Sequence, residues 1–303
     1  MMSGNPLEEV VSGSISRRLK IVIALALLLA GSPIILTYGL LILSSFSTNM
    51  VTDPLLTDFQ PTLDNWIMFL RGQITYATGG LERNVVEMTL VTLTVAVGVA
   101  LTATLVSLLA AYSISRMDFK GRGVFTAGLI MLHAFPGVAL IIGVYMIFRI
   151  IGDVLGVLGE EFYAIAYIIL ARAALEVPMA IWLFKGFFDK IPWELEWSAL
   201  VDGASRVRVW WSILVPLVKP GIAAVLIFTF LAGWEEFIYF YVFLKPFGID
   251  SLPTFIEEIV AAAENYQLTI IAAAGTFYLL PTIVFFVLTQ RLLLEAYSGG
   301  LKG

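Results

Sequence analysis

Long apolar runs separated by short polar segments dominate the pattern of this chain. Each of six runs is long enough to supply the ~20 residues that a helix needs to cross a bilayer. The segments between them carry most of the charged residues, together with many of the prolines and glycines. The pattern therefore predicts an all-α membrane protein with six transmembrane helices, over residues 20–46, 85–114, 123–150, 162–186, 220–245 and 268–293.

Composition agrees with this pattern. Of the 303 residues, 59% are hydrophobic and 14% are charged, whereas soluble domains are roughly 45–50% apolar. The first apolar run follows Arg17, Arg18 and Lys20, but about 26 apolar residues exceed the h-region of a signal peptide. We therefore expect this run to remain as a membrane span, preceded by a short cytoplasmic tail over residues 1–16.

The distribution of lysine and arginine predicts the orientation in the membrane. Cytoplasmic loops carry the excess of these residues. One set of loops holds Arg17, Arg18, Lys20, Arg116, Lys120, Arg122, Lys185, Lys190, Arg206, Arg208, Lys219, Arg291 and Lys302, and the other holds only Arg71, Arg83, Arg149 and Lys245. Both termini and the loop over residues 187–219 are therefore expected in the cytoplasm, and the loop over residues 47–84 outside it.

The segment Ile191 to Pro220 is the most informative polar stretch. Pro192 suits the first turn of a helix, where its missing N–H costs nothing, and Glu194 and Glu196 favour the positive end of the helix dipole. Gly203 is expected to end this helix, and Ser205 to cap a second one. The first helix carries an apolar stripe at helical spacing, made of Trp193, Trp197, Leu200 or Val201, and Ala204.

This run, IPWELEWSALVDGASRVRVWWSILVPLVKPGI, resembles the EAA loop of the membrane-spanning subunits of binding-protein-dependent ABC importers. The family pattern reads IP.ELEEAA..DGA followed by LP...P. Trp197 and Ser198 replace the second Glu and the first Ala of that pattern. The matching positions are Ile191, Pro192, Glu194, Leu195, Glu196, Ala199, Asp202, Gly203, Ala204, Pro216 and Pro220.

The resemblance implies the permease subunit of a carbohydrate importer of the maltose/trehalose type, with the type I permease fold over residues 17–303. It implies a second permease subunit in a heterodimer, two ATPase subunits that hold ATP and Mg, and an extracytoplasmic sugar-binding protein. This chain itself would hold no cofactor. The residues expected to couple to the ATPase are Pro192, Glu194, Glu196, Trp197, Ala199, Asp202, Gly203 and Ala204.

Ionisable residues inside the apolar runs are the second set of candidates. Arg172 and Glu176 are one helical turn apart and start about 13 residues, or ~20 Å, before Lys185. Charged groups at that depth usually face the bundle interior or a water-filled cavity. Arg172 and Glu176 could form an internal ion pair or line the transport pathway, and the sequence leaves both interpretations open. His133, the only histidine, is interpreted as a packed or water-facing residue.

The fifth run contains the segment AGWEEFIYFYVFL, which resembles the family's Trp-Asn-x-Phe segment with Glu235 in place of the Asn. Adjacent helical residues point about 100° apart, so Glu235 and Glu236 are not expected to face one partner. We expect Trp234, Glu235 and Tyr239 to line the substrate pathway, because aromatic faces beside hydrogen-bonding acids suit a polyol. An aromatic belt at the outer membrane interface explains some of these rings equally well.

Other function classes fit less well. The chain has no G-x-x-x-x-G-K-[ST] segment, so it is not expected to hydrolyse ATP, and it shows no catalytic or metal-ligand arrangement outside the membrane. A net charge of −5 without a basic-aromatic face argues against nucleic acid. The alternative is a secondary transporter that uses Arg172, Glu176, Glu235 and Glu236 as a proton relay. That alternative leaves the EAA-like loop unexplained.

Overall fold

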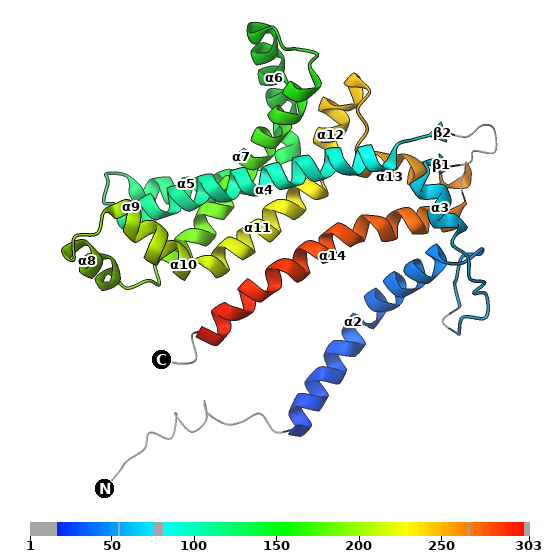
Figure 1. Ribbon diagram of the computed structural model, residues 1–303, viewed down its shortest axis with the longest axis horizontal. Coiled ribbons are helices and arrows are strands. Elements are labelled where there is room, and N and C mark those ends of the chain that lie inside the picture. Colours follow the sequence, from blue (N-terminus) through cyan, green and yellow to red (C-terminus); the bar gives the residue numbers. More distant parts are fainter. Residues whose placement is uncertain (1–16, 54, 75–80, 266, 300–303) are drawn as a thin grey trace.

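The fold is helical and elongated (Figure 1), as the computed structural model describes it for residues 17–53, 55–74, 81–265 and 267–299. A two-stranded antiparallel ribbon pairs β1 (Gln73–Ile74) with β2 (Leu81–Glu82). The predicted all-α class is confirmed. The helices are α2 (Arg17–Ser45), α3 (Asp64–Leu70), α4 (Val85–Arg116), α5 (Arg122–His133), η1 (Gly137–Leu140), α6 (Ile141–Leu155), α7 (Glu161–Phe188), α8 (Trp193–Val201), α9 (Arg206–Val209), η2 (Trp210–Leu214), α10 (Val215–Leu217), α11 (Lys219–Trp234), α12 (Ile238–Phe243), η3 (Lys245–Phe247), α13 (Leu252–Ala261), η4 (Ala263–Asn265) and α14 (Leu268–Gly299).

Helix α4 is the centre of the bundle and packs along both α7 and α11. Small residues on α4 allow the neighbouring backbones to approach closely. A Cβ added at Gly233 of α11 would lie 2.8 Å from the Cα of Ala96, so only glycine fits at this crossing. The buried small residues of α4 include Ala96, Ala100, Thr104, Ser107 and Ala111.

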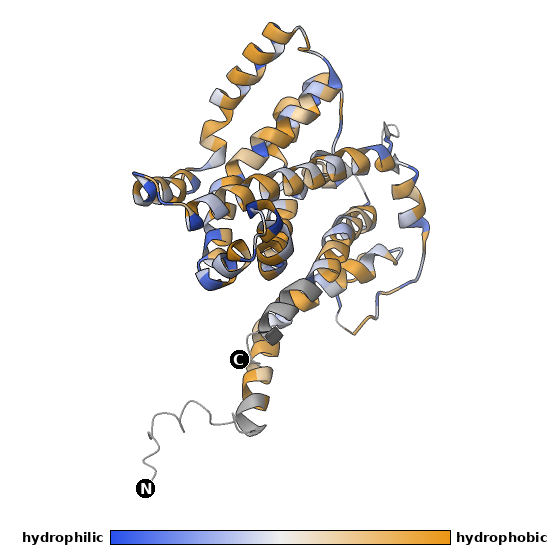
Figure 2. Cartoon of the chain, turned by 60° about the vertical axis from the view of Figure 1, so that its left-hand side comes forward, coloured by the Kyte–Doolittle hydropathy of each residue, from blue (hydrophilic) through white to orange (hydrophobic). Residues whose placement is uncertain are grey.

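Five described helices are long and apolar enough to cross a membrane, and a bent pair, Arg206–Leu217 with Lys219–Trp234, raises the number to six. This agrees with the six spans predicted from the apolar runs. Apolar residues predominate along most of the helices in Figure 2, and many large ones are exposed, as expected where the surrounding solvent is lipid. Helix α2 is the extreme case, since its apolar window is 0% buried in this chain.

The third and fifth runs are not single helices. The break in the run over residues 123–150 is the one that Pro136 predicts, whereas the break in the run over residues 220–245 corrects the expectation of one continuous helix. The third run breaks at Pro136, between α5 and η1. Proline lacks an N–H and disfavours helical backbone in the preceding residue, so the helix must stop there. The fifth run breaks after Trp234, and the chain resumes as α12 at Ile238. Both breaks line one cavity.

The predicted extracytoplasmic loop is tied down by one buried amide. Asn65 of α3 donates hydrogen bonds to the carbonyl oxygens of Ser45 (3.2 Å) and Ser47 (2.7 Å) and accepts one from Thr269 (3.0 Å). These bonds join the end of α2, the loop and the start of α14. Each removes the cost of a buried unpaired polar group.

Candidate functional site

The EAA-like loop folds as helix α8 followed by a glycine-dependent turn. Pro192 lies directly before the helix rather than in its first turn, with φ −58° and ψ 138°. At the other end Gly203 has a φ of +87°, its N–H bonds the Leu200 oxygen, and the Ala204 N–H bonds the Ala199 oxygen. This is a Schellman motif, which requires a residue that tolerates left-handed backbone.

The inner face of α8 is fixed to α4 by a buried ion pair. Glu196 is only 4% exposed, and its Oε2 lies 3.5 Å from Nε of Arg116, while the Tyr112 hydroxyl donates to its Oε1 at 2.9 Å. Arg116 also donates to the carbonyl oxygens of Phe188 (3.1 Å) and Ile191 (2.8 Å). This carboxylate is enclosed within the chain, so any part that Glu196 takes in coupling acts through Arg116 and Tyr112 of α4.

The outer face of α8 is open. Trp197 is 59% and Val201 is 83% exposed, and Glu194 and Asp202 are also exposed. Figure 1 places α8 at the end of the molecule opposite α13 and the β1–β2 ribbon. The predicted apolar stripe is therefore split between the two faces. Trp197 and Val201 face outward, whereas Leu200 and Ala204 pack against the internal core and the Arg116 guanidinium lies 4.6 Å from the ring centre of Trp193.

Side-chain hydrogen bonds fix the start of the loop and its second helix. Ser205 caps α9, since its Oγ accepts a hydrogen bond from the Arg208 N–H at 3.3 Å. Asp189, just after α7, accepts hydrogen bonds from Lys185 and from Ser115 (2.6 Å). Burial alone would raise the pKa of Asp189, but these bonds and the Lys185 charge hold it below its ordinary value. The carboxylate is therefore charged at neutral pH.

The loop joins α11 at a sharp bend. The segment Arg206–Leu217 and helix α11 are inclined by 73°, and Val218 between them leaves the helical region with φ −96° and ψ 7°. Pro220 removes the N–H that would bond the Pro216 oxygen, and its ring crowds that carbonyl. The bend directs α11 back along α4 and α7, as Figure 1 shows.

Arg172 is the hub of the charged cluster inside the bundle. Its Nη2 lies 3.2 Å from Oε1 of Glu176, and its Nε lies 2.6 Å from Oε2 of Glu236. Its Nη2 also donates to the Ala232 oxygen at 3.1 Å. The sequence indicated Arg172 and Glu176 by their helical spacing, but Glu236 reaches Arg172 only because α7 and the end of α11 lie side by side.

A cavity of about 400 Å³ opens beside this cluster. Glu235 lines it and is exposed, and no hydrogen bond or ion pair reaches its carboxylate among the described residues. Tyr239 also lines it. The expectation that Trp234 lines the pathway is corrected, because Trp234 is 0% exposed and its Nε1 donates to the Tyr278 oxygen at 3.2 Å. The lining residues are Gly137, Val138, Arg172, Glu235, Glu236, Phe237, Ile238 and Tyr239.

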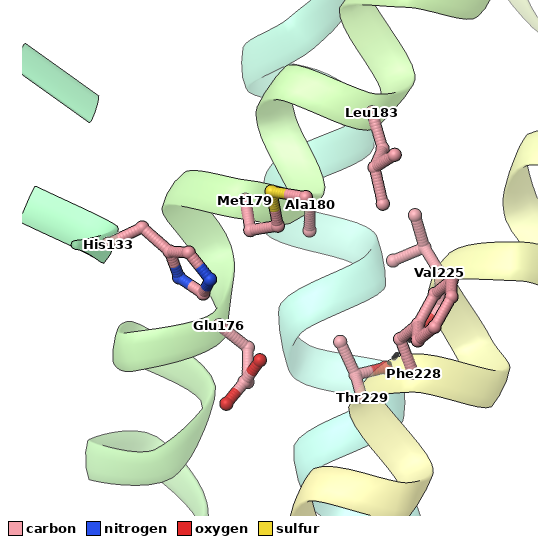
Figure 3. Close-up of a pocket in the computed structure, with 8 residues that line it drawn as sticks. All are labelled: His133, Glu176, Met179, Ala180, Leu183, Val225, Phe228 and Thr229. Carbon is pink, nitrogen blue, oxygen red and sulfur yellow. Dashed lines mark hydrogen bonds between the residues drawn. The ribbon is translucent and has the colours of Figure 1, made fainter. Parts of the chain in front are cut away.

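A second cavity of about 320 Å³ lies between α5, α7 and α11 (Figure 3). His133 and Glu176 extend into it from α5 and α7, and Thr229 lies across it on α11. His133 is exposed, in agreement with its interpretation as a water-facing residue. Glu176 lines this cavity, whereas Arg172 and Glu236 line the first one, so the charged cluster reaches both cavities.

Comparison with known protein families gives one clear match. Residues 103–296 match the family described as the binding-protein-dependent transport system inner membrane component. That region includes α8, the bend, the charged cluster and both cavities.

Individual permease proteins are also similar to this chain in sequence. A putative ABC transporter permease protein of Streptomyces antibioticus is 32% identical over 225 residues, which cover 73% of this chain and 92% of that one. The trehalose transport system permease protein SugB of Mycobacterium tuberculosis is 27% identical over 263 residues, 86% and 89% of the two chains. The trehalose/maltose transport system permease protein MalG of Thermococcus litoralis is 24% identical over 249 residues, 82% and 84% of the two chains.

A solved structure has a similar fold. It is the crystal structure of a bacterial ABC transporter involved in the import of the acidic polysaccharide alginate, and the match has a TM-score of 0.66 at 17% identity. The alignment covers 96% of this chain and 99% of that chain. The elongated helical arrangement of the two proteins is therefore the same over nearly their full lengths.

Proposed function

The chain belongs to the family of binding-protein-dependent transport system inner membrane components, and we propose that it is the permease subunit of an ATP-driven ABC importer for a sugar or small oligosaccharide. The observation that carries this proposal is helix α8, which is anchored internally by Glu196 and presents Trp197 and Val201 outward. The family match covers this loop. Relatives of similar length bear the names of trehalose and trehalose/maltose permeases, and a longer relative bears the name of an α-glucoside permease.

The proposed assembly contains a second permease, two ATPase subunits that hold ATP and Mg, and an extracytoplasmic sugar-binding protein. Closure of the ATPase dimer would displace α8. The buried Glu196–Arg116 pair would transmit this displacement to α4, and α4 packs along α7 and α11, the helices that border the second cavity. Chemical energy would enter this chain only through α8, since no nucleotide-binding motif occurs in its sequence.

The proposed location is the cytoplasmic membrane, with both termini and α8 inside the cell. The lysine and arginine count of the loops supports this orientation. The loop over residues 47–84 and helix α13 would then face the binding protein. In this orientation α8 lies at the cytoplasmic end of the chain, where an ATPase subunit could reach it.

The proposed pathway for the sugar includes Glu235 and Tyr239, and the Arg172–Glu176 pair belongs to its wall. An exposed carboxylate within a membrane span is costly against lipid and is tolerated beside protein or water. Glu235 is such a carboxylate, and it lies at the break that ends α11. Trp234 supports this break from inside the core, stacked on Phe230 and Tyr278.

Reconstitution tests this function against its rival. The chain is purified with its co-expressed partners and placed in lipid vesicles, and uptake of labelled trehalose, maltose and other oligosaccharides is measured. We expect uptake that requires enclosed ATP and the binding protein and that survives a protonophore. Uptake by the chain alone, driven by a proton gradient and abolished by the protonophore, would instead establish the secondary transporter.

A further inference from the structure

The charges around the larger cavity do not balance. Glu176 and Glu236 both pair with Arg172, so these three groups together carry one net negative charge. Both oxygens of Glu236 are occupied, since Oε1 accepts from the Tyr239 N–H at 2.9 Å and Oε2 faces Arg172. Glu235 adds a second negative charge, and within the described part of the chain no cation reaches it. The cluster of one arginine and three carboxylates therefore has a formal net negative charge.

Tyr239 lines the same cavity and carries a buried hydroxyl without a partner among the described residues. Tyr239 is 3% exposed, and its hydroxyl forms no hydrogen bond with any described residue. The Arg172 guanidinium lies over the Tyr239 ring, 5.8 Å from its centre, and leaves the hydroxyl free. A buried hydroxyl without a partner is costly, so this group would gain from a ligand that reaches it from the cavity.

We propose that the cavity lined by Glu235, Glu236 and Tyr239 binds a positively charged sugar, a saccharide with a protonated amino group. This inference rests on the proposed function and specifies its substrate class. The ammonium group supplies the charge that Glu235 lacks, and a neighbouring sugar hydroxyl bonds the Tyr239 oxygen. Phe237 offers an aromatic ring to the apolar face of the sugar and to the cation. A neutral sugar would satisfy the hydroxyl and leave the charge unbalanced.

The absence of cysteine from the sequence permits a direct test. Ile238, which lines the cavity, is replaced by cysteine in the assembled transporter in lipid vesicles. Its labelling by methanethiosulfonates with a trimethylammonium or a sulfonate group is followed on this chain by intact mass. Leu55→Cys, at a site that is 83% exposed and outside the cavity, gives the intrinsic ratio of the two reagents. The Ile238→Cys ratio is then measured with Glu235→Gln and with Glu257→Gln, a matched change at an exposed position of α13.

Relative to Leu55→Cys, we expect the cationic reagent to be favoured at Ile238→Cys by about tenfold, because an unbalanced carboxylate attracts cations strongly at short range in a partly buried site. Glu235→Gln should lower the ratio several-fold and Glu257→Gln should not. A ratio of one would overturn the proposal, because it would mean that a neighbouring subunit already supplies the cation.

Protection by sugars tests the ligand itself. Cellobiose and its analogue with one hydroxyl of each ring replaced by an amino group have the same skeleton. We expect the amino analogue to slow the labelling of Ile238→Cys at least tenfold more effectively than cellobiose does. Equal protection, or none, overturns the proposal. ATP-driven uptake of neutral oligosaccharides in the same vesicles tests the importer function separately, so the two can fail independently.

Discussion

At the residue scale, Arg172 pairs with two carboxylates inside the bundle. It is 14% exposed at its side chain and compensates two carboxylates. We expect Arg172→Leu to lower stability by about 3–5 kcal/mol, because it strands buried charges. The triple variant Arg172→Leu, Glu176→Leu and Glu236→Leu should lose less stability, because it removes both carboxylates that paired with Arg172. Melting temperatures of the assembled complex measure this, with Arg149→Leu as the control for loss of an exposed arginine. Equal losses in the single and triple variants would show that the groups are hydrated independently.

Gly203 is constrained by its backbone alone. A Cβ added there would meet no atom within 4 Å, yet its φ is +87°. Gly203→Ala should therefore cost about 1–2 kcal/mol through left-handed strain, and Gly203→Pro should also remove the N–H that bonds Leu200. We expect stepwise loss of ATP-driven uptake while the chain still inserts into membranes. Gly186→Ala is the control, since that glycine lies within α7 without positive φ and with equal space. Normal sugar-stimulated ATPase activity in Gly203→Pro would contradict this role.

Local chemistry determined which residues could be predicted from the sequence. Gly203 and Ser205 were predicted because a helix end depends on its own few residues. The burial of Glu196 and of Trp234 was not predicted, because it depends on α4 and α14, which lie far away in sequence. The partner of Glu236 was missed for the same reason. Periodicity places a side chain on a face of its helix, but it does not say which helix covers that face.

At the scale of elements, the two faces of α8 have separable roles. Glu196→Ala leaves Arg116 buried without its carboxylate and should lower the melting temperature of the chain, since breaking a buried pair costs about 3–5 kcal/mol. Trp197→Asp changes a side chain that is 59% exposed and should leave that temperature nearly unchanged. It should instead weaken binding of the ATPase subunit about tenfold or more, because it places a charge in an apolar contact.

Thermal melts and co-purification with the ATPase subunit distinguish these two effects. Glu194→Gln serves as the control, as it changes the charge of an exposed residue on the same helix. The assignment of faces would be wrong if Trp197→Asp destabilised the isolated chain as much as Glu196→Ala does. It would also be wrong if Glu196→Ala melted normally but lost the ATPase.

The breaks in the spans show why apolar length is an incomplete guide to helices. Hydropathy indicated all six runs, but the third divides at Pro136 and the fifth after Trp234. Proline made the first break predictable. The second has no proline, and it is stabilised by Glu236, which accepts the Tyr239 N–H at the start of α12. Backbone freed within a membrane is tolerated where it lines a cavity, and both breaks line the one next to Glu235.

At the scale of the whole molecule, the elongated shape separates two ends that we expect to lie on opposite sides of the membrane. Leu55 in the loop over residues 47–84 and Val201 on α8 are each 83% exposed, so their intrinsic accessibility is matched. The chain has no cysteine, and Leu55→Cys and Val201→Cys therefore each provide one thiol. The positive-inside distribution predicts that Leu55 is outside the cytoplasm and Val201 inside it.

A membrane-impermeant maleimide applied to intact cells (for a double-membrane organism, to spheroplasts) should label Leu55→Cys and leave Val201→Cys unlabelled. Permeabilised cells should label both. Co-expression of the ATPase subunit should then slow labelling of Val201→Cys alone, because the outer face of α8 would be covered, and adding Trp197→Asp should restore the fast rate. Labelling of Val201→Cys in intact cells would contradict the predicted orientation, because it would place α8 outside the cytoplasm. Slow labelling that persists with Trp197→Asp would mean that this tryptophan does not contribute to the contact, since Val201 reports occupancy of the same exposed face.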